Sequence, residues 1–142
     1  MSTEANKAIV RRYFDEVFNA KRLDVVAELF APDAVYTVAG LPEPARGPDA
    51  VAGAVAGFLA GFPDLQMTIE ALVAEADQVA VRYTGSGTHQ GDLMGVPPTG
   101  RRVRLPGIAV YRLAEGRIVA GWDSADILGL LAQIGALPAP AA

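Results

Sequence analysis

The sequence predicts a single α+β domain in which helices cover one face of a curved antiparallel sheet. Apolar residues first recur at helical spacing, and after Pro63 they alternate with polar residues as in strands. A short amphipathic helix then ends near Gly135. The chain has 142 residues, of which 51% are hydrophobic, and this length suits one core. We therefore expect one domain over residues 1–137 and a disordered tail over 138–142.

The first helix is expected over residues 5–20, where large apolar residues recur in pairs four positions apart. Ser2 or Thr3 can cap its N-terminus, because both side chains accept hydrogen bonds from free backbone amides. A second helical segment, 23–30, must stop at Pro32, since a proline pushes the preceding residue out of the helical region.

A short strand at 35–38 is expected to precede a third helix. That helix begins at Pro48, which suits the first helical turn, and stops at Gly61-Phe62-Pro63. Further strands form an antiparallel meander with turns at 76–78 and at Glu115-Gly116. These strands cover residues 65–73, 79–84, 103–113 and 118–123, and alternation places Leu65, Met67, Ile69 and Val73 on the buried face.

The final helix is predicted to have Ser124 as its N-cap and Gly135 as its stop. A bent sheet roofed by helices encloses a pocket, so we expect one beneath this sheet. Loop 90–101 is rich in glycine and proline and long enough to form a lid, although an inert crossover fits equally well.

The composition argues against several classes of protein. Twelve basic and sixteen acidic residues give a net charge of −4, which disfavours binding to nucleic acid or anionic lipid. With no cysteine and His89 as the single histidine, we expect no metal site. Gly85, Gly87 and Gly91 do not have the spacing of a dinucleotide-binding fingerprint, so we expect no nucleotide cofactor either. Neither a membrane span nor a secretory signal is visible, so we expect a cytoplasmic protein.

Two acidic residues mark the junction between the last strand and the last helix. Asp123 and Asp126 follow Trp122, the single tryptophan. If Asp126 lies in the first helical turn, its carboxyl group borders the apolar stripe and faces the pocket. Apolar surroundings raise the pKa of such a group and let it exchange a proton near neutral pH. The alternative is that an acid in this position only complements the helix dipole.

His89 ends a predicted strand and opens loop 90–101. A histidine there can hydrogen-bond a ligand, or it can pin the loop by bonding a backbone group. Arg82 has outward parity in its strand and faces solvent, unless it is buried beside a carboxylate such as Asp123. The residues expected to line the pocket, if they do more than pack the core, are Tyr13, Phe14, Phe30, Tyr36, Phe58, Met67, Tyr83, Met94 and Trp122.

Four segments carry a family resemblance. They are Leu29-Phe30-Ala31-Pro32-Asp33-Ala34-Val35-Tyr36, Gly87-Thr88-His89-Gln90-Gly91 with Gly95-Val96-Pro97-Pro98-Thr99-Gly100-Arg101, Gly116-Arg117-Ile118-Val119, and Trp122-x-x-x-Asp126 with Leu130-Leu131-x-Gln133-Ile134-Gly135. In combination they resemble the SnoaL-like polyketide cyclases of the NTF2-like superfamily, over nearly the whole chain.

The resemblance implies a cone-shaped, cystatin-like fold with a deep apolar pocket, paired into a homodimer through the outer sheet face. It also implies cofactor-free ring closure of a small hydrophobic carbonyl compound, a polyketide ester, by intramolecular aldol addition. One aspartate then acts as acid and base. By position that role falls on Asp126, with Asp123 as a competitor, and His89 becomes an auxiliary hydrogen-bonding group near the substrate carbonyl.

Two alternatives remain at this point. Hydration of an epoxide by a carboxylate-activated water, as in other NTF2-like enzymes, needs Arg82 or Arg104 buried beside Asp123. A non-catalytic protein that binds a hydrophobic ligand would instead turn Asp123, Asp126 and His89 to solvent.

Overall fold

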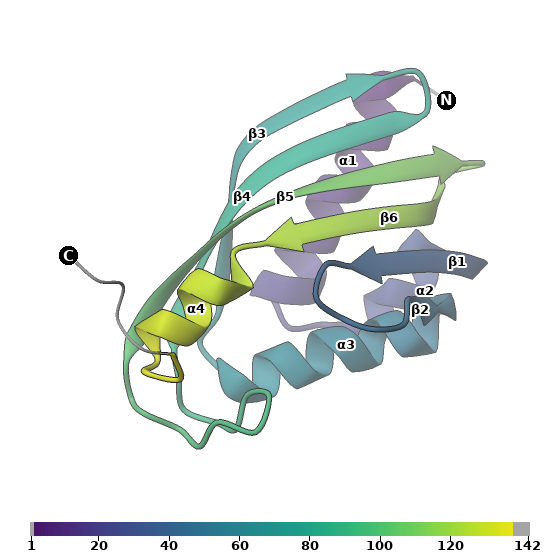
Figure 1. Cartoon of the computed structure of the whole chain (residues 1–142). Coiled ribbons are helices and arrows are strands. Elements are labelled where there is room, and N and C mark those ends of the chain that lie inside the picture. The colour runs from purple at the N-terminus through teal and green to yellow at the C-terminus, as the bar shows by residue number, and fades with distance from the viewer. Residues whose placement is uncertain (1, 138–142) are drawn as a thin grey trace.

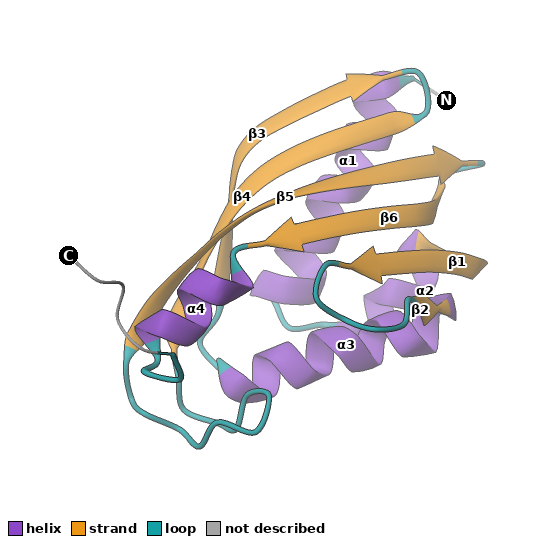
Figure 2. Cartoon of the chain, in the orientation of Figure 1, coloured by secondary structure: helices purple, strands orange, loops and turns teal. Residues whose placement is uncertain are grey.

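Six strands form one curved sheet in the order β2-β1-β6-β5-β4-β3. The computed structural model describes residues 2–137, and the tail expected over 138–142 lies outside the described residues. The strands are β1 (Phe30–Val38), β2 (Ala45–Arg46), β3 (Gln66–Glu75), β4 (Gln78–Thr88), β5 (Arg102–Ala114) and β6 (Arg117–Ala125). Together with the helices packed on this sheet they confirm the predicted α+β class (Figures 1 and 2).

The helices flank the sheet at different places. Helix α1 (Thr3–Arg12) crosses β3 and β4, α3 (Gly47–Gly61) lies below β1, and α4 (Ile127–Gln133) lies where β5 begins (Figure 1). A 3-10 turn, Leu23–Val25, leads into the short α2 (Val26–Leu29).

The first helix begins as predicted, with the Ser2 hydroxyl accepting a hydrogen bond of 3.0 Å from the Ala5 amide. It does not stay an α-helix, because residues Tyr13–Asn19 form a π-helix. The wider π turn buries four side chains of this short run, namely Tyr13, Phe14, Val17 and Phe18.

Two strands differ from the prediction in their pairing or in the face that their side chains occupy. β1 begins at Phe30 rather than at residue 35, and it pairs with β6 in parallel, so the sheet is mixed rather than purely antiparallel. In β3 a bulge between Ile69 and Ala71 reverses the alternation of side chains. For this reason Val73, predicted to be buried, is 64% exposed.

Two side-chain amides close edges of the sheet. Asn19 accepts a hydrogen bond from the Met67 amide at 2.7 Å and donates one to the Met67 carbonyl at 2.9 Å. Gln133 binds the amide and carbonyl of Arg104 in the same way, both at 2.8 Å. Each amide replaces a missing neighbouring strand, so the π-helix is fixed to β3 and α4 is fixed to β5.

The core lies between the helices and the face of the sheet that carries Tyr83 and Tyr111, both buried, which we call the inner face. The opposite, outer face carries Arg82, Ile108 and Trp122, all exposed. Within residues 2–137, none of the helices is long and apolar enough to span a membrane.

Candidate active site

Strand β6 places the carboxylate of Asp123 on the inner face, between two tyrosine side chains. The Tyr36 hydroxyl donates to Oδ2 and the Tyr83 hydroxyl donates to Oδ1, each at 2.6 Å. The strand register explains this convergence: Tyr36 is paired with Gly121 and Tyr83 with Gly107. Both rings therefore start from positions diagonal to Asp123 and reach it across a glycine.

Two further tyrosines complete the cluster, which contains all four tyrosines of the chain. The ring of Tyr111 stacks on that of Tyr36, with centroids 6.2 Å apart and planes inclined by 10°. Tyr13, from the π-helix, meets Tyr111 edge to face at 5.9 Å. The hydroxyl oxygens of Tyr13 and Tyr111 are buried and have no hydrogen-bond partner among the described residues.

Burial controls the protonation of this cluster. It raises the pKa of Asp123, and the hydrogen bonds from Tyr36 and Tyr83 partly offset that rise. Within residues 2–137 no lysine or arginine forms an ion pair with Asp123. Burial and the nearby negative charge also raise the pKa of both tyrosines, so both remain hydrogen-bond donors around a carboxylate of increased proton affinity.

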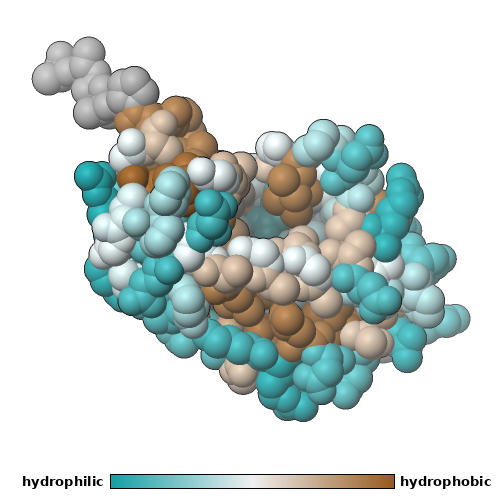
Figure 3. Space-filling model, turned by 90° about the horizontal axis from the view of Figure 1, so that it is seen from below, coloured by the Kyte–Doolittle hydropathy of each residue, from teal (hydrophilic) through white to brown (hydrophobic). Residues whose placement is uncertain are grey.

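Asp123 is not wholly enclosed in the core. Asp123 is half-buried, whereas the two tyrosines that hold it are buried. The surface seen from below is hollowed near its centre, with hydrophobic side chains around much of the rim and a paler, more hydrophilic floor (Figure 3). The molecule therefore has a hollow on this side that is a candidate entrance for a small molecule.

Asp126 has a different position. It is exposed, and its Oδ1 accepts a hydrogen bond of 2.9 Å from the Gly129 amide as the N-cap of α4. The predicted cap, Ser124, lies instead in β6, which continues to Ala125. The helix therefore begins later than expected. Asp126 stabilises its N-terminus, which was the structural alternative to a catalytic role.

His89 is fully buried and anchors the loop that follows it. Its Nδ1 accepts a hydrogen bond from the Thr99 amide at 3.2 Å and lies 3.0 Å from Thr99 Oγ1. Its backbone carbonyl accepts from the Gly100 amide, and its amide donates to the Arg101 carbonyl. Its ring packs against Phe62 at 5.6 Å. These contacts match the expectation of an imidazole that pins loop 90–101.

Most of the predicted pocket residues lie inside the molecule, but two do not. Trp122 is 47% exposed because it directly precedes Asp123 in β6 and so points to the outer face. Met94 is 59% exposed in a turn of loop 90–101.

Tyr111 belongs to the cluster but was not predicted, although alternation along 103–113 could have placed it on the inner face. The residues found inside are Tyr13, Phe14, Phe30, Tyr36, Met67 and Tyr83, with Phe58 half-buried.

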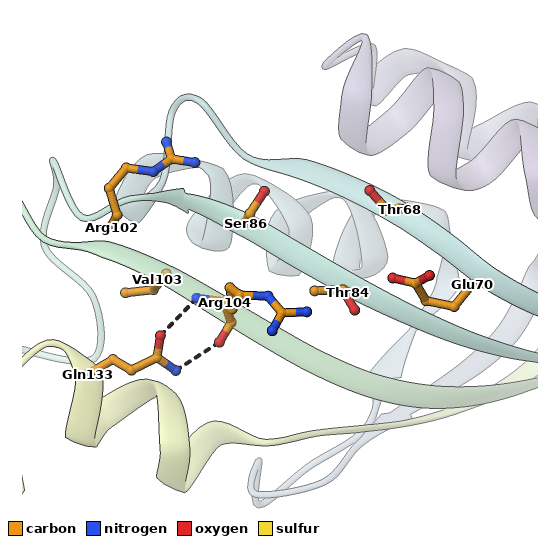
Figure 4. Close-up of a pocket in the computed structure, with 8 residues that line it drawn as sticks. All are labelled: Thr68, Glu70, Thr84, Ser86, Arg102, Val103, Arg104 and Gln133. Atoms are coloured by element: carbon orange, nitrogen blue, oxygen red, sulfur yellow. Dashed lines mark hydrogen bonds between the residues drawn. The ribbon is translucent and has the colours of Figure 1, made fainter.

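A groove on the outer face contains none of the predicted site residues. It is lined by polar side chains from β3, β4 and β5, beside the hydrogen bonds between Gln133 and Arg104 (Figure 4). Arg82 and Arg104 are both exposed, and neither pairs with Asp123 in the described part of the chain. The arginine bridge required for epoxide hydration is therefore not formed.

The other alternative also lacks its expected geometry, because Asp123 and His89 do not turn to solvent. Residues 2–137 contain no group of three or more His, Cys, Asp or Glu side chains placed to hold a metal ion.

Known proteins resemble this chain over nearly its whole length. Aklanonic acid methyl ester cyclase DnrD of Streptomyces peucetius is 33% identical over 138 residues, covering 95% of this chain and 92% of that protein. A structure from Jannaschia sp. CCS1, named as a candidate SnoaL-like polyketide cyclase, has a TM-score of 0.88 at 28% identity and covers 96% of this chain and 95% of its own. AclR of Streptomyces galilaeus, named as a candidate hydroxylase, has a TM-score of 0.86 at 33% identity, with coverage of 99% and 87%.

The family model for SnoaL-like polyketide cyclases matches residues 8–134, which run from within α1 to the end of α4 and include Asp123 and the four tyrosines. The chain therefore belongs to the SnoaL-like polyketide cyclase family.

Proposed function

We propose that the protein closes a ring in a polyketide-like carbonyl compound by intramolecular aldol addition, with Asp123 as both base and acid. The observation that carries this proposal is the Asp123 carboxylate, held on the inner face by hydroxyl groups of Tyr36 and Tyr83 at 2.6 Å. Burial raises the pKa of Asp123, which makes it a better proton acceptor than an exposed aspartate.

The reaction begins when Asp123 removes a proton from a carbon that lies between two carbonyl groups, which leaves an enolate. The enolate carbon then attacks another carbonyl carbon of the same molecule, so a carbon–carbon bond forms and the carbonyl oxygen becomes an alkoxide. The protonated Asp123 returns its proton to that alkoxide. Substrate and product are isomers, and nothing is oxidised or reduced, so one acid/base group can serve both proton transfers.

The hollow contributes by holding the substrate folded. Bringing the two reacting carbons of a flexible chain together in the right orientation lowers the barrier by on the order of 7 kcal/mol or more. Hydrophobic side chains on the rim of the hollow (Figure 3) offer apolar contact for such a compound. His89 is assigned to loop 90–101 in this proposal and not to the substrate.

The proposed substrate class is the methyl ester of a polyketide acid, the class for which DnrD is named. The electrostatics of the site favour an ester over the free acid. A free carboxylate would be repelled by Asp123, and no cation of the described residues pairs with Asp123 to offset that repulsion. Methylation removes the charge and leaves the carbonyl groups that the aldol step needs.

The test is to incubate the purified protein with aklanonic acid methyl ester and to separate the products by chromatography with mass detection. We expect an isomer of unchanged mass. Asp123→Asn should lower kcat/KM by about 10²–10⁴-fold, the usual contribution of a general base, while Asp126→Asn retains activity. Full activity of Asp123→Asn would overturn the assignment. A product that has gained an oxygen atom would instead indicate hydroxylation, the activity for which AclR is named.

We also propose that the protein forms a homodimer through its outer face. An apolar row crosses four paired strands there, from Val73 through Ala80 and Val110 to Trp122. Val73 and Trp122 at its ends are 64% and 47% exposed. A two-fold contact between outer faces would bury this row on both copies at once.

Light scattering of the purified protein tests the dimer. The expected mass is twice the 14.8 kDa of one chain, and Trp122→Arg should reduce it to that of one chain. Leu128→Arg is the matched control, because Leu128 is also exposed but lies on α4. A wild-type protein that stays monomeric at micromolar concentration would contradict the proposal.

A further inference from the structure

Two glycines occupy inner-face positions in the middle of the tyrosine cluster, where alternation would ordinarily place a side chain. Gly107 lies in β5 next to Tyr83 of β4, and Gly121 lies in β6 between Tyr111 of β5 and Tyr36 of β1. A glycine weakens a strand and offers no side chain to pack. Its presence opposite a large ring therefore calls for a physical reason.

The reason for Gly107 is the path of the Tyr83 side chain. A Cβ atom at position 107 would overlap the Cζ atom and the hydroxyl oxygen of Tyr83, and it would lie 2.9 Å from Cε2. The tip of the Tyr83 ring thus lies directly over Gly107. Only because this position is empty does the hydroxyl group cross β5 and reach Asp123 Oδ1.

Gly121 has the same relation to the other tyrosine. A Cβ atom there would lie 2.7 Å from Tyr36 Cδ2 and 3.1 Å from Tyr111 Cδ1. The stacked pair of rings closes over the bare backbone, and the Tyr36 hydroxyl reaches Asp123 Oδ2 from that side. The two contacts differ in one respect: an added methyl group at 121 meets the bodies of two rings, whereas at 107 it meets the tip of one.

We propose that Gly107 and Gly121 are positioning residues of the site: by carrying no side chain, they let Tyr83 and Tyr36 lie across neighbouring strands and hold both oxygens of Asp123. The inference rests on the proposed function only for its effect on turnover. The geometry itself concerns the free protein and can be tested without a substrate.

Gly107→Ala is the more informative variant, because the tip of a tyrosine ring can move aside while the fold persists. The added methyl group displaces the Tyr83 hydroxyl and so removes one of the two donors to Asp123. The groups that face Asp123 are then Tyr36 from β1, Tyr111 from β5 and Tyr13 from the π-helix. With one donor fewer, the charged form of Asp123 is less stabilised.

The first experiment titrates the side-chain carboxyl carbon of Asp123 by NMR in the protein without substrate. We expect Gly107→Ala and Tyr83→Phe to move the midpoint to higher pH, and the double variant to move it no further. Gly53→Ala is the control, because a Cβ atom there, on α3, meets nothing within 4 Å. A midpoint that moves in Tyr83→Phe but not in Gly107→Ala would overturn the proposal, whatever reaction the protein catalyses.

Turnover supplies a second measurement. The pH profile of kcat/KM for Gly107→Ala should shift in the same direction, so that activity falls by about tenfold on the acid limb and much less on the plateau. A purely structural defect would lower both parts of the profile equally, and that result would count against a positioning role.

Stability measurements keep the proposal testable if Gly107→Ala folds poorly. In a Tyr83→Ala background the ring is gone and the added methyl group has room. We therefore expect Gly107→Ala to lower the urea midpoint in the wild-type background and to leave it unchanged in the Tyr83→Ala background. An equal loss in both backgrounds, or failure of the double variant to fold, would show that Gly107 is required for another reason.

Discussion

The two aspartates at the end of β6 can be separated by replacing Asp126 alone. Its carboxyl group accepts the hydrogen bond from the Gly129 amide at 2.9 Å, and a Cβ atom on Gly129 would lie only 2.8 Å from Asp126 Cγ. Loss of such a cap costs about 1 kcal/mol. For a chain of 142 residues, that loss lowers Tm by about 4 °C. Asp126→Ala should show this decrease.

Asp126→Asn is the matched variant, because an asparagine oxygen can accept the same hydrogen bond. We expect its Tm to equal that of the wild type. Both variants should keep the wild-type kcat/KM at temperatures well below Tm, since Asp126 is exposed and its side-chain hydrogen bond goes to its own helix.

Thermal unfolding and turnover are measured on the same samples. The decisive result is the one for Asp126→Asn, in which the fold and the cap are preserved. A fall in kcat/KM of about 10²-fold or more, at unchanged Tm, would make Asp126 the proton acceptor and refute the assignment of that role to Asp123.

Two further predictions concern the stability of the site. Because the pKa of folded Asp123 is raised, its ionised form destabilises the fold. Urea unfolding of Asp123→Asn should therefore show a gain in stability over the wild type at neutral pH, and that gain should shrink as pH falls toward the ordinary aspartate value of 3.8. A gain that instead grew as the pH fell would contradict a raised pKa for Asp123. Tyr111→Phe removes a buried hydroxyl that lacks a partner among the described residues, so its Tm should rise by the equivalent of about 1 kcal/mol; a lower Tm would mean that this hydroxyl is hydrogen-bonded.

Local rules predicted most elements of the fold. Ser2 caps α1, Pro48 opens α3, and Glu115-Gly116 forms the tight turn with φ values of 51° and 80°. Each depends on residues close together in the sequence, so each is visible without the fold. The parallel pairing of β1 with β6 was not predicted, because it joins segments far apart in the chain and nothing in either strand specifies its neighbour.

In the candidate site too, features set by neighbouring residues could be predicted, and features that join distant segments could not. The end of β6 could have been predicted better, because Asp126 directly precedes Ile127, the first apolar residue of the helix, and aspartate is as good a cap as Ser124. If the strand continues past Asp123, alternation places the Asp123 side chain on the inner face, because Trp122 is on the outer face. The gathering of four tyrosines around Asp123, two of which bond it, could not have been derived in that way, since it depends on the register of four strands and on the π-helix.

The features that surround and position Asp123 are also ones that lower the stability of the core. A half-buried carboxylate without a cation, two buried hydroxyls without a partner, and two glycines within strands each lower the stability of a sheet. Other parts of the chain are stabilised by local contacts: Ser2 caps α1, Asp126 caps α4, and Asn19 and Gln133 close edges of the sheet. Several departures gathered around one carboxylate indicate that selection has acted there on something other than stability. The surroundings of Asp123 are therefore an argument for function that does not depend on the identity of the substrate.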